Sequence, residues 1–358
     1  MTNSKRIAGL LAAATIGALA LAGCSTSGGS TAADAASSGD ESITLTKDVH
    51  LVVGTSAQEG AVFTDSGIFD DAPYTIDWSY ITDWGAIYSS IASDSLNVGY
   101  WGLDANIFKA VQNGVPAKLV SLLGADASAE DAGALNVFVR TDAGIDTTED
   151  LKGTTISTGS AGTTFDNVLT AALSNGGLTE ADVNVVRYPD SDQTSQINSL
   201  LDGDAQAFAG NITSEQIIDA LDAGTIKVLY WQDQALPINR IVVSNDQTLG
   251  DPAKAAALED FAQRVAQAQN WKNDPANKDK LVAITTASTK LPTAVAEKSY
   301  DYTVDSTVPL ALDSTTTQKL EATIGDFVDF GLLTEPVEVS DVLDTRFADA
   351  IQTAIDSK

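Results

Sequence analysis

Cysteine and histidine are almost missing from this sequence, which has one of each in 358 residues. Because Cys24 is the single thiol, no disulfide can form within the chain. His50 lies in the apolar run VHLVVG, a pattern typical of a strand. Zinc sites of cysteine and histidine, and serine or cysteine nucleophiles activated by histidine, are therefore poorly supported.

Basic residues are also scarce, with 20 Lys and Arg against 49 Asp and Glu and a formal net charge of −29. A chain this acidic repels the phosphates of nucleic acids, so we expect no nucleic-acid partner. The carboxylates are numerous enough for an acid–base pair, but no local pattern singles one out. The composition favours a scaffold with few reactive groups.

Residues 1–23 are organised like an export signal. Lys5 and Arg6 precede an apolar run at residues 7–22, which is too short and too rich in alanine and glycine for a convincing membrane span. The sequence LAGC at 21–24 resembles the lipobox of bacterial lipoproteins, which implies cleavage before Cys24 and a lipid on its sulfur. An ordinary signal peptide with an incidental cysteine is the alternative. Residues 24–45, rich in Ser, Ala and Gly, are predicted to form the lipidated cysteine and a flexible tether.

The rest of the chain alternates between short apolar runs and helical patterns. Buried strands are predicted at residues 49–54, 74–81, 96–101, 134–140, 154–159, 183–188, 205–210, 225–231 and 240–245. Helices are predicted at 86–92, 106–114, 165–177, 194–203 and 214–224, and the chain becomes mostly helical after residue 250. This alternation predicts an α/β fold whose ligand lies beyond the carboxyl ends of the strands.

Four turns that follow predicted strands carry small polar residues, at 54–60, 82–85, 99–104 and 157–164. A helix N-terminus carries roughly half a positive charge, so such turns can hold an anionic or hydrogen-bond-accepting group without Arg or Lys. Plain N-capping by serine and threonine is the alternative. The turn at 157–164 is not a P-loop, because no Gly-Lys-Ser/Thr sequence follows it.

Several stretches resemble, in the same order, the solute-binding lipoproteins of bacterial ABC importers, in the branch for nitrate, sulfonate, taurine and thiamine precursors. They include VHLVVGTSAQEG from residue 49, GYWG at 99–102, DLKG at 150–153, GTT at 162–164 and FGLLTEPVEVSDVLD at 330–344. The resemblance implies a two-lobe periplasmic-binding-protein fold of type II, with lobes joined by two crossing strands near residues 138–141 and 238–241. Lobe 1 would comprise residues 46–139 and 240–358, including the C-terminal helices, and lobe 2 residues 140–239.

The same resemblance implies one cleft between the lobes. Its ligand-binding residues would be Ser56, Gln58, Trp84, Tyr100, Trp101, Gly102, Asp104, Gly162, Thr163, Thr164, Asp166 and Asn211. The aromatic residues could stack on a ligand, although aromatic residues beside strands are also common in cores. The two aspartates would suit an amine or a ring N–H. Sulfonate-binding relatives usually show a Trp-Asp/Glu-Pro phrase where this chain has GNIT at 210–213, so one wall of the cleft differs.

These residues favour capture and delivery of a solute without cofactor or metal. The expected ligand is a small organosulfonate or a taurine-like zwitterion, and a heteroaromatic vitamin precursor of the thiamine-pyrimidine type is the alternative. The resemblance implies an ABC permease as partner and a monomer held through Cys24 on the extracytoplasmic face of the membrane. A lipid-anchored hydrolase working through carboxylates and a structural or adhesive lipoprotein are alternatives from other classes.

Overall fold

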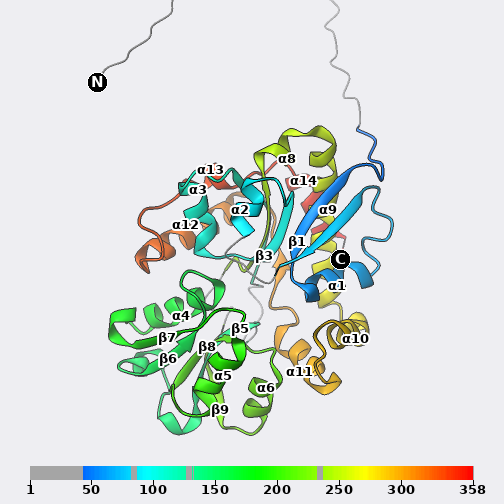
Figure 1. Ribbon diagram of the computed structural model, residues 1–358. Helices are drawn as coiled ribbons and strands as arrows, with labels where there is room; N and C mark the ends of the chain where they lie inside the picture. Colours follow the sequence, from blue (N-terminus) through cyan, green and yellow to red (C-terminus); the bar gives the residue numbers. More distant parts are fainter. Residues whose placement is uncertain (1–42, 82–86, 126–130, 132, 232–236, 358) are drawn as a thin grey trace, which may run out of the picture. The chain divides into compact units, whose positions relative to one another are not determined.

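The computed structural model describes residues 43–81, 87–125, 131, 133–231 and 237–357. Within the compact unit Ile43–Lys358 the strands form two mixed sheets, which confirms the predicted α/β class (Figure 1). The first sheet has the order β11-β4-β10-β3-β1-β2, with β1 (His50–Thr55), β2 (Thr75–Tyr80), β3 (Val98–Gly102), β4 (Ala117–Gly124), β10 (Arg240–Asn245) and β11 (Val308–Pro309). We call this sheet and its helices lobe 1.

The second sheet repeats the plan of the first. Its order is β7-β6-β8-β5-β9, with β5 (Leu135–Arg140), β6 (Thr155–Thr158), β7 (Asn184–Arg187), β8 (Ala207–Asn211) and β9 (Ile226–Tyr230). Each sheet contains an inner strand that runs antiparallel to both neighbours, β10 between β3 and β4 and β5 between β8 and β9. Each of these strands is the first one that the chain forms after leaving the other sheet. In the first sheet β4 also runs antiparallel to both of its neighbours, β10 and β11. We call the second sheet and its helices lobe 2.

The chain leaves the first sheet at Gly124 and enters the second at Leu135. The sequence placed this first crossing between the lobes near residues 138–141. In the structure it lies before these residues, because β5 pairs with β8 and β9 and residues 135–139 therefore belong to the sheet of lobe 2. The return runs from Tyr230 to Arg240, the residue at which lobe 1 was expected to resume.

Helices lie against both faces of the first sheet (Figure 1). The helices of lobe 1 are α1 (Ala57–Asp65), α2 (Ile87–Ala92), α3 (Ala105–Gln112), α8 (Asp246–Gly250), α9 (Pro252–Asn273), α10 (Lys278–Thr289), α11 (Thr293–Thr303), α12 (Ser314–Asp329), α13 (Val339–Val342) and α14 (Ala348–Asp356). Of these, α10 packs on α1, and α11 packs on α10. Lobe 2 has α4 (Thr164–Asn175), α5 (Gln193–Leu201) and α6 (Glu215–Asp222). Short 3-10 helices occupy Thr141–Ala143, Thr148–Leu151, Glu180–Asp182 and Pro275–Asn277.

An aromatic cluster fixes α1 and α9 against the first sheet. The ring of Phe63 on α1 lies 5.7 Å from that of Trp78 on β2, 5.2 Å from that of Tyr100 on β3 and 6.3 Å from that of Phe261 on α9. Phe63 and Phe261 are fully buried, and each such side chain contributes about 2 kcal/mol through the hydrophobic effect. The cluster therefore holds the start of α1 and the end of β3 in a fixed relation.

The sequence did not predict β4 or β11. The segment AKLVSLLG of β4 contains Ala, Lys and Leu, which are not favoured in strands, and it lacks period-two alternation. β4 forms because it lies between β10 and β11 with nearly every residue buried. Burial on both faces removes the alternation by which a strand is recognised.

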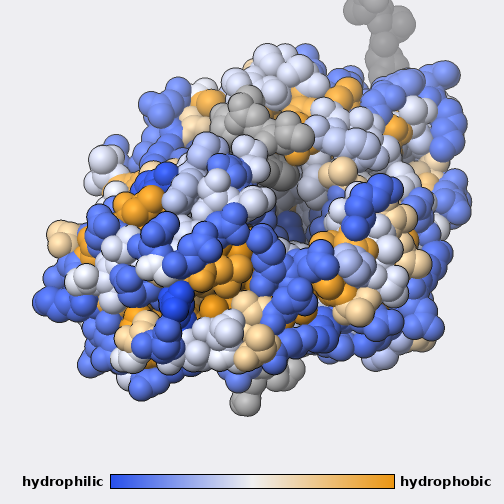
Figure 2. All heavy atoms as spheres, turned by 60° about the horizontal axis from the view of Figure 1, so that its bottom comes forward, coloured by the Kyte–Doolittle hydropathy of each residue, from blue (hydrophilic) through white to orange (hydrophobic). Residues whose placement is uncertain are grey.

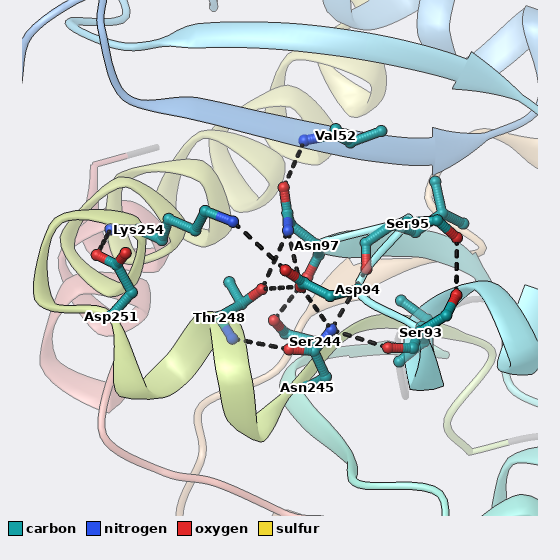
Figure 3. Close-up of polar contacts among 12 residues, drawn as sticks. Val52, Ser93, Asp94, Ser95, Asn97, Ser244, Asn245, Thr248, Asp251 and Lys254 are labelled. Carbon is teal, nitrogen blue, oxygen red and sulfur yellow. Dashed lines mark hydrogen bonds and ion pairs between the residues drawn. The ribbon is translucent and has the colours of Figure 1, made fainter.

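A polar network joins the loop before β3 to the end of β10 and to α8 (Figure 3). Asp94, at φ 56°, accepts hydrogen bonds at Oδ1 from Asn97 Nδ2 (2.9 Å), Asn245 Nδ2 (3.0 Å) and Thr248 Oγ1 (3.0 Å), and Lys254 Nζ lies 3.6 Å from Oδ2. Burial raises the pKa of Asp94, but these hydrogen bonds and the charge of Lys254 outweigh it and hold the pKa below its usual value. The network contributes stability above the unfolded pKa and loses it as the pH falls through the folded pKa.

Asp94→Ala should lower the free energy of unfolding by about 3 kcal/mol, because three donors lose their acceptor and alanine is strained at positive φ. Asp94→Asn is the matched control, since asparagine tolerates this conformation and keeps an oxygen at Oδ1. It should cost about 1 kcal/mol. Urea unfolding measures both, and equal midpoints for the two variants would contradict the role of the Oδ1 acceptor.

Candidate functional site

A cavity of about 360 Å³ is lined by both lobes. On the side of lobe 1 it meets the turn between β1 and α1, the end of β3, the start of β10 and the end of α9; on the side of lobe 2 it meets the start of α4 and the ends of β7 and β8. These positions lie at the carboxyl ends of the parallel strands, as the alternating pattern predicted.

Most of the predicted ligand-binding residues lie on this cavity wall. They are Ser56, Gln58, Tyr100, Trp101, Gly102 and Asp104 from lobe 1 and Thr163, Thr164 and Asn211 from lobe 2. Several of them also cap helices: Ser56 caps α1 and Asp104 caps α3. The sequence analysis treated N-capping and ligand binding as alternatives for these turns. In the structure the same residues cap a helix and line the cavity.

Gly162 and Asp166 do not line the cavity. Asp166 is fully buried below the turn before α4, where its Oδ2 accepts from Gly162 N (2.7 Å) and its Oδ1 pairs with Arg187. Gly162 takes φ 76°, which favours glycine. The structure gives Asp166 a buried position paired with Arg187, whereas the sequence placed its carboxylate near the cleft. Trp84 lies outside the described residues.

A chain of hydrogen bonds orients Trp101 at the cavity. Trp101 Nε1 donates to the hydroxyl of Tyr88 (3.3 Å), and this hydroxyl donates to Asp104 Oδ1 (2.6 Å). The same Oδ1 accepts from the backbone N–H groups of Asn106 (3.0 Å) and Ile107 (3.2 Å) at the start of α3. The carboxylate of Asp104 thus links the helix to the indole ring.

Burial raises the pKa of Asp104 to about 6, against the opposing effect of the hydrogen bond from Tyr88. Between its usual value of 3.8 and about 6 the native protein binds more protons than the unfolded chain, so stability falls as the pH rises through this window. Asp104→Asn keeps a capping oxygen but cannot ionise. The difference in free energy of unfolding between Asp104→Asn and the parent should therefore increase in favour of the variant by about 1.4 kcal/mol for each pH unit between about pH 4 and pH 6. Denaturant unfolding at several pH values measures this, and a pH-independent difference would contradict it.

The glycines of the GYWG segment have separate packing roles. A Cβ on Gly99 would lie 1.6 Å from Cζ3 of Trp101, so only glycine leaves room for the indole ring. A Cβ on Gly102 would lie 2.7 Å from the Thr164 side chain, so glycine there allows α4 of lobe 2 to approach β3 of lobe 1. The two glycines that carried the sequence resemblance therefore shape the cavity.

Gly99→Ala should push Trp101 out of position, lower the free energy of unfolding by about 2 kcal/mol and weaken ligand binding. Gly325→Ala on α12 is the control, because an added Cβ there meets nothing within 4 Å. This control should be neutral or stabilising by up to about 1 kcal/mol. Parental stability and binding in Gly99→Ala would show that the ring does not need this space.

The sequence missed three charged residues that meet at the cavity. Lys272 Nζ lies 3.2 and 3.3 Å from the two carboxylate oxygens of Glu59, and Arg240 lies 3.4 Å from Glu59 Oε1. The Arg240 guanidinium also stands over the ring of Tyr100, at 5.9 Å. We call Glu59, Arg240 and Lys272 the charge cluster. It contains two cations and one anion.

The electrostatics of the charge cluster favour the ionised forms of Glu59 and Arg240. Burial raises the pKa of Glu59, but the charges of Lys272 and Arg240 lower it further, so the net shift is downward. Burial lowers the pKa of Arg240, but Glu59 and Tyr100 raise it, and the net shift is upward. The side chains of Arg240 and Lys272 remain 33% and 22% exposed. The charge cluster therefore presents one net positive charge to the cavity.

On the side of lobe 2 the cavity wall carries a third carboxylate, after those of Glu59 and Asp104. Asp190, which follows β7, accepts from Ser160 N at Oδ1 (2.7 Å), and burial raises its pKa.

In the GNIT segment, Asn211 Oδ1 accepts from the backbone N (3.0 Å) and Oγ1 (2.7 Å) of Thr213. A tight polar turn thus stands where sulfonate-binding relatives were expected to show tryptophan.

The cavity also reaches α10 and α11. Val282, Thr285, Ala296 and Val304 from this region line it, together with Val62 of α1. This part of the wall also carries the hydroxyl-bearing residues Ser299, Thr303 and Ser306. The cavity thus offers one ligand a charged part and a part in which apolar side chains alternate with hydroxyl groups.

Another cavity among the described residues is lined by Asp71, Asp260 and Arg264, whose charges pair with one another. His50 begins β1, is half-exposed, and its Nδ1 lies 2.8 Å from Asp77, outside the cavity wall. Among the described residues no group of His, Cys, Asp and Glu side chains is arranged to hold a metal ion. None of the helices in the described part of the chain combines the length and apolar character that a bilayer crossing requires. On the face in Figure 2, hydrophilic residues predominate and hydrophobic ones lie in separate groups.

Two solved structures share this fold. The periplasmic aliphatic sulphonate-binding protein SsuA of Escherichia coli is 17% identical with a TM-score of 0.66, over 82% of this chain and 91% of that protein. The alkanesulfonate-binding protein SsuA of Xanthomonas axonopodis pv. citri, bound to MOPS, is 16% identical with a TM-score of 0.68, over 83% and 98%. The predicted periplasmic-binding-protein fold is thereby confirmed.

An enzyme shares the fold too. The desulfurization enzyme DSZB is 15% identical with a TM-score of 0.58, over 85% of this chain and 99% of the enzyme.

No curated protein matches the sequence significantly. The family model described as "NMT1/THI5 like" matches residues 98–276, half of the chain. This match includes β3, all of lobe 2, β10 and α9.

Proposed function

Because this chain belongs to the NMT1/THI5-like family, we propose that it is the substrate-binding protein of an ABC importer. It captures a small organosulfonate or a taurine-like zwitterion in the cavity between its lobes. The observation that carries this proposal is the charge cluster, with its net positive charge on a cavity lined by both lobes. Closure of the lobes on the ligand selects a state that a permease can recognise.

A sulfonate head group suits the charge cluster. It carries one negative charge and three acceptor oxygens, and the guanidinium of Arg240 and the ammonium of Lys272 supply charge-assisted donors. Ser56 and Thr163 bring hydroxyls to the same cavity from the two lobes. Binding across both lobes gives the ligand contacts that exist only in the closed state.

Asp104 and Asp190 support a zwitterion. Both line the cavity, and neither pairs with a cation in the hydrogen bonds and ion pairs of the described residues. An ammonium on the ligand would neutralise the carboxylates while its sulfonate meets Arg240 and Lys272. Taurine has this arrangement of charges.

A heteroaromatic precursor of the thiamine-pyrimidine type is the second candidate. The ring of Trp101 at the cavity and the raised pKa of Asp104 favour it, because an uncharged or shared-proton carboxyl pairs well with a ring nitrogen. The charge cluster favours the sulfonate, because a neutral pyrimidine leaves its positive charge without a partner.

We infer that the protein binds its ligand without converting it. The described cavity wall holds no His or Cys, and its buried Glu59 is held ionised by two cations, which does not suit a general acid. Similarity to DSZB makes a hydrolytic or desulfurising activity the alternative. Recovery of a ligand chemically unchanged after incubation distinguishes the two.

The proposed place of action is the extracytoplasmic face of the membrane. The signal at residues 1–23 and the lipobox-like LAGC support a lipid anchor at Cys24. Residues 1–42 lie outside the described part of the chain, so the anchor rests on the sequence. An ABC permease is the proposed partner, and we propose that the protein acts as a monomer.

Alkanesulfonates and taurine should raise the unfolding temperature, with about 2.7 kcal/mol of stabilisation at a ligand concentration a hundredfold above Kd. Because part of the cavity is apolar, each methylene added to an alkanesulfonate should tighten binding about fourfold, or ~0.8 kcal/mol, until the cavity is filled. Thermal-shift assays and calorimetry with nitrate and aminopyrimidines as comparison ligands measure this.

Arg240→Met should abolish the response to sulfonates. Arg140→Met, which breaks a surface pair with Asp142 outside the cavity wall, is the control and should retain it. A response to aminopyrimidines alone would select the second candidate. Release of sulfite, or no response to any of these ligands, would overturn the proposal.

A further inference from the structure

We propose that Glu59 sets the charge of the ligand that this cavity accepts: it admits head groups with one negative charge and rejects those with two. This inference rests on the proposed function, since it concerns the same cavity. Glu59 acts as an internal counter-ion that occupies half of the available positive charge.

The contacts of Glu59 support this role. Its two oxygens are shared between Lys272 of α9 and Arg240 of β10, at 3.2 to 3.4 Å. The charge of Glu59 also raises the pKa of Tyr100 on β3. Lys280 of α10, the helix packed on α1, donates instead to the carbonyl of Ser66 (3.0 Å). The positive charge that Glu59 neutralises is therefore that of Arg240 and Lys272.

The other charges on the cavity wall act in the same direction. Arg240 and Lys272 are the cations among the described residues of the wall, and Glu59, Asp104 and Asp190 are its anions. A monoanionic head group balances the net charge of the cluster. A second negative charge would find no cation to balance it and would meet three carboxylates. Like charges juxtaposed in a binding site cost several kcal/mol.

Glu59 is also held in place independently of any ligand. It lies in the first turn of α1, where its backbone N–H donates to the cap Ser56 (3.2 Å), and it is 8% exposed. The aromatic cluster fixes α1 on the sheet through Phe63. A ligand therefore meets a preset charge, which is a means of rejecting wrong ligands as well as binding right ones.

Ethanesulfonate and ethylphosphonate are matched probes for this rule. The sulfonate remains a monoanion, whereas the phosphonate changes from a monoanion to a dianion between about pH 5.5 and about pH 8.5. Calorimetry on the unmodified protein gives the ratio of the two Kd values at each pH, in which effects that are equal for both ligands cancel. As the phosphonate becomes a dianion, its Kd should rise by about tenfold or more relative to the Kd of the sulfonate. A constant ratio, or one that favours the dianion, would overturn the inference.

Two variants identify Glu59 as the cause. In Glu59→Gln the cluster gains one positive charge, so the pH-dependent discrimination should largely disappear. In Glu59→Gln/Lys272→Met the net charge returns to that of the parent, and the discrimination should return. The readout is the ratio of Kd values, so a uniform loss of affinity does not mimic it. Unaltered discrimination in Glu59→Gln, or no recovery in the double variant, would assign the effect to another group.

The two proposals fail in different ways. If neither ethanesulfonate nor taurine binds the unmodified protein, the proposed sulfonate ligand is wrong. If ethanesulfonate binds but the phosphonate dianion binds equally well, the function stands and the charge rule is wrong. The unmodified protein alone decides this point, even if the Glu59 variants do not fold.

Discussion

The ion cluster of Glu59, Arg240 and Lys272 is the interaction on which the binding site depends. It joins the first turn of α1, the first residue of β10 and the end of α9, three segments far apart in the sequence. Arg240 is also the first residue of β10, the first strand that the chain forms in lobe 1 after it returns from lobe 2. A ligand that engages this guanidinium therefore touches the segment through which the two lobes are connected.

The packing around the cluster serves the same cavity. Phe63 and Tyr100 hold α1 against β3, and Gly99 leaves room for the Trp101 ring, which the Tyr88 hydroxyl orients. In an acidic chain without a disulfide, burial and short hydrogen-bond chains supply this rigidity. Two cations then suffice to make the cavity attractive to an anion, although the protein carries a formal net charge of −29.

The sequence predicted the local features of the fold well. It did not predict which residues far apart in the chain come together at the site. The nine predicted strands and the polar turns at Ser56, Asp104 and Thr163 follow local rules of periodicity and capping, and they occur in the structure. β4 was missed because burial removes its alternation. Glu59, Arg240 and Lys272 were missed because no spacing rule links residues so far apart. The pairing of Asp166 on α4 with Arg187 on β7 was missed for the same reason.

A crystal structure of the protein with ethanesulfonate tests the central claim most directly. The account predicts that the sulfonate oxygens lie within hydrogen-bonding distance of Arg240 and Lys272, with at least one contact from lobe 2. A sulfonate bound elsewhere, or one in this cavity that contacts neither cation, would contradict it.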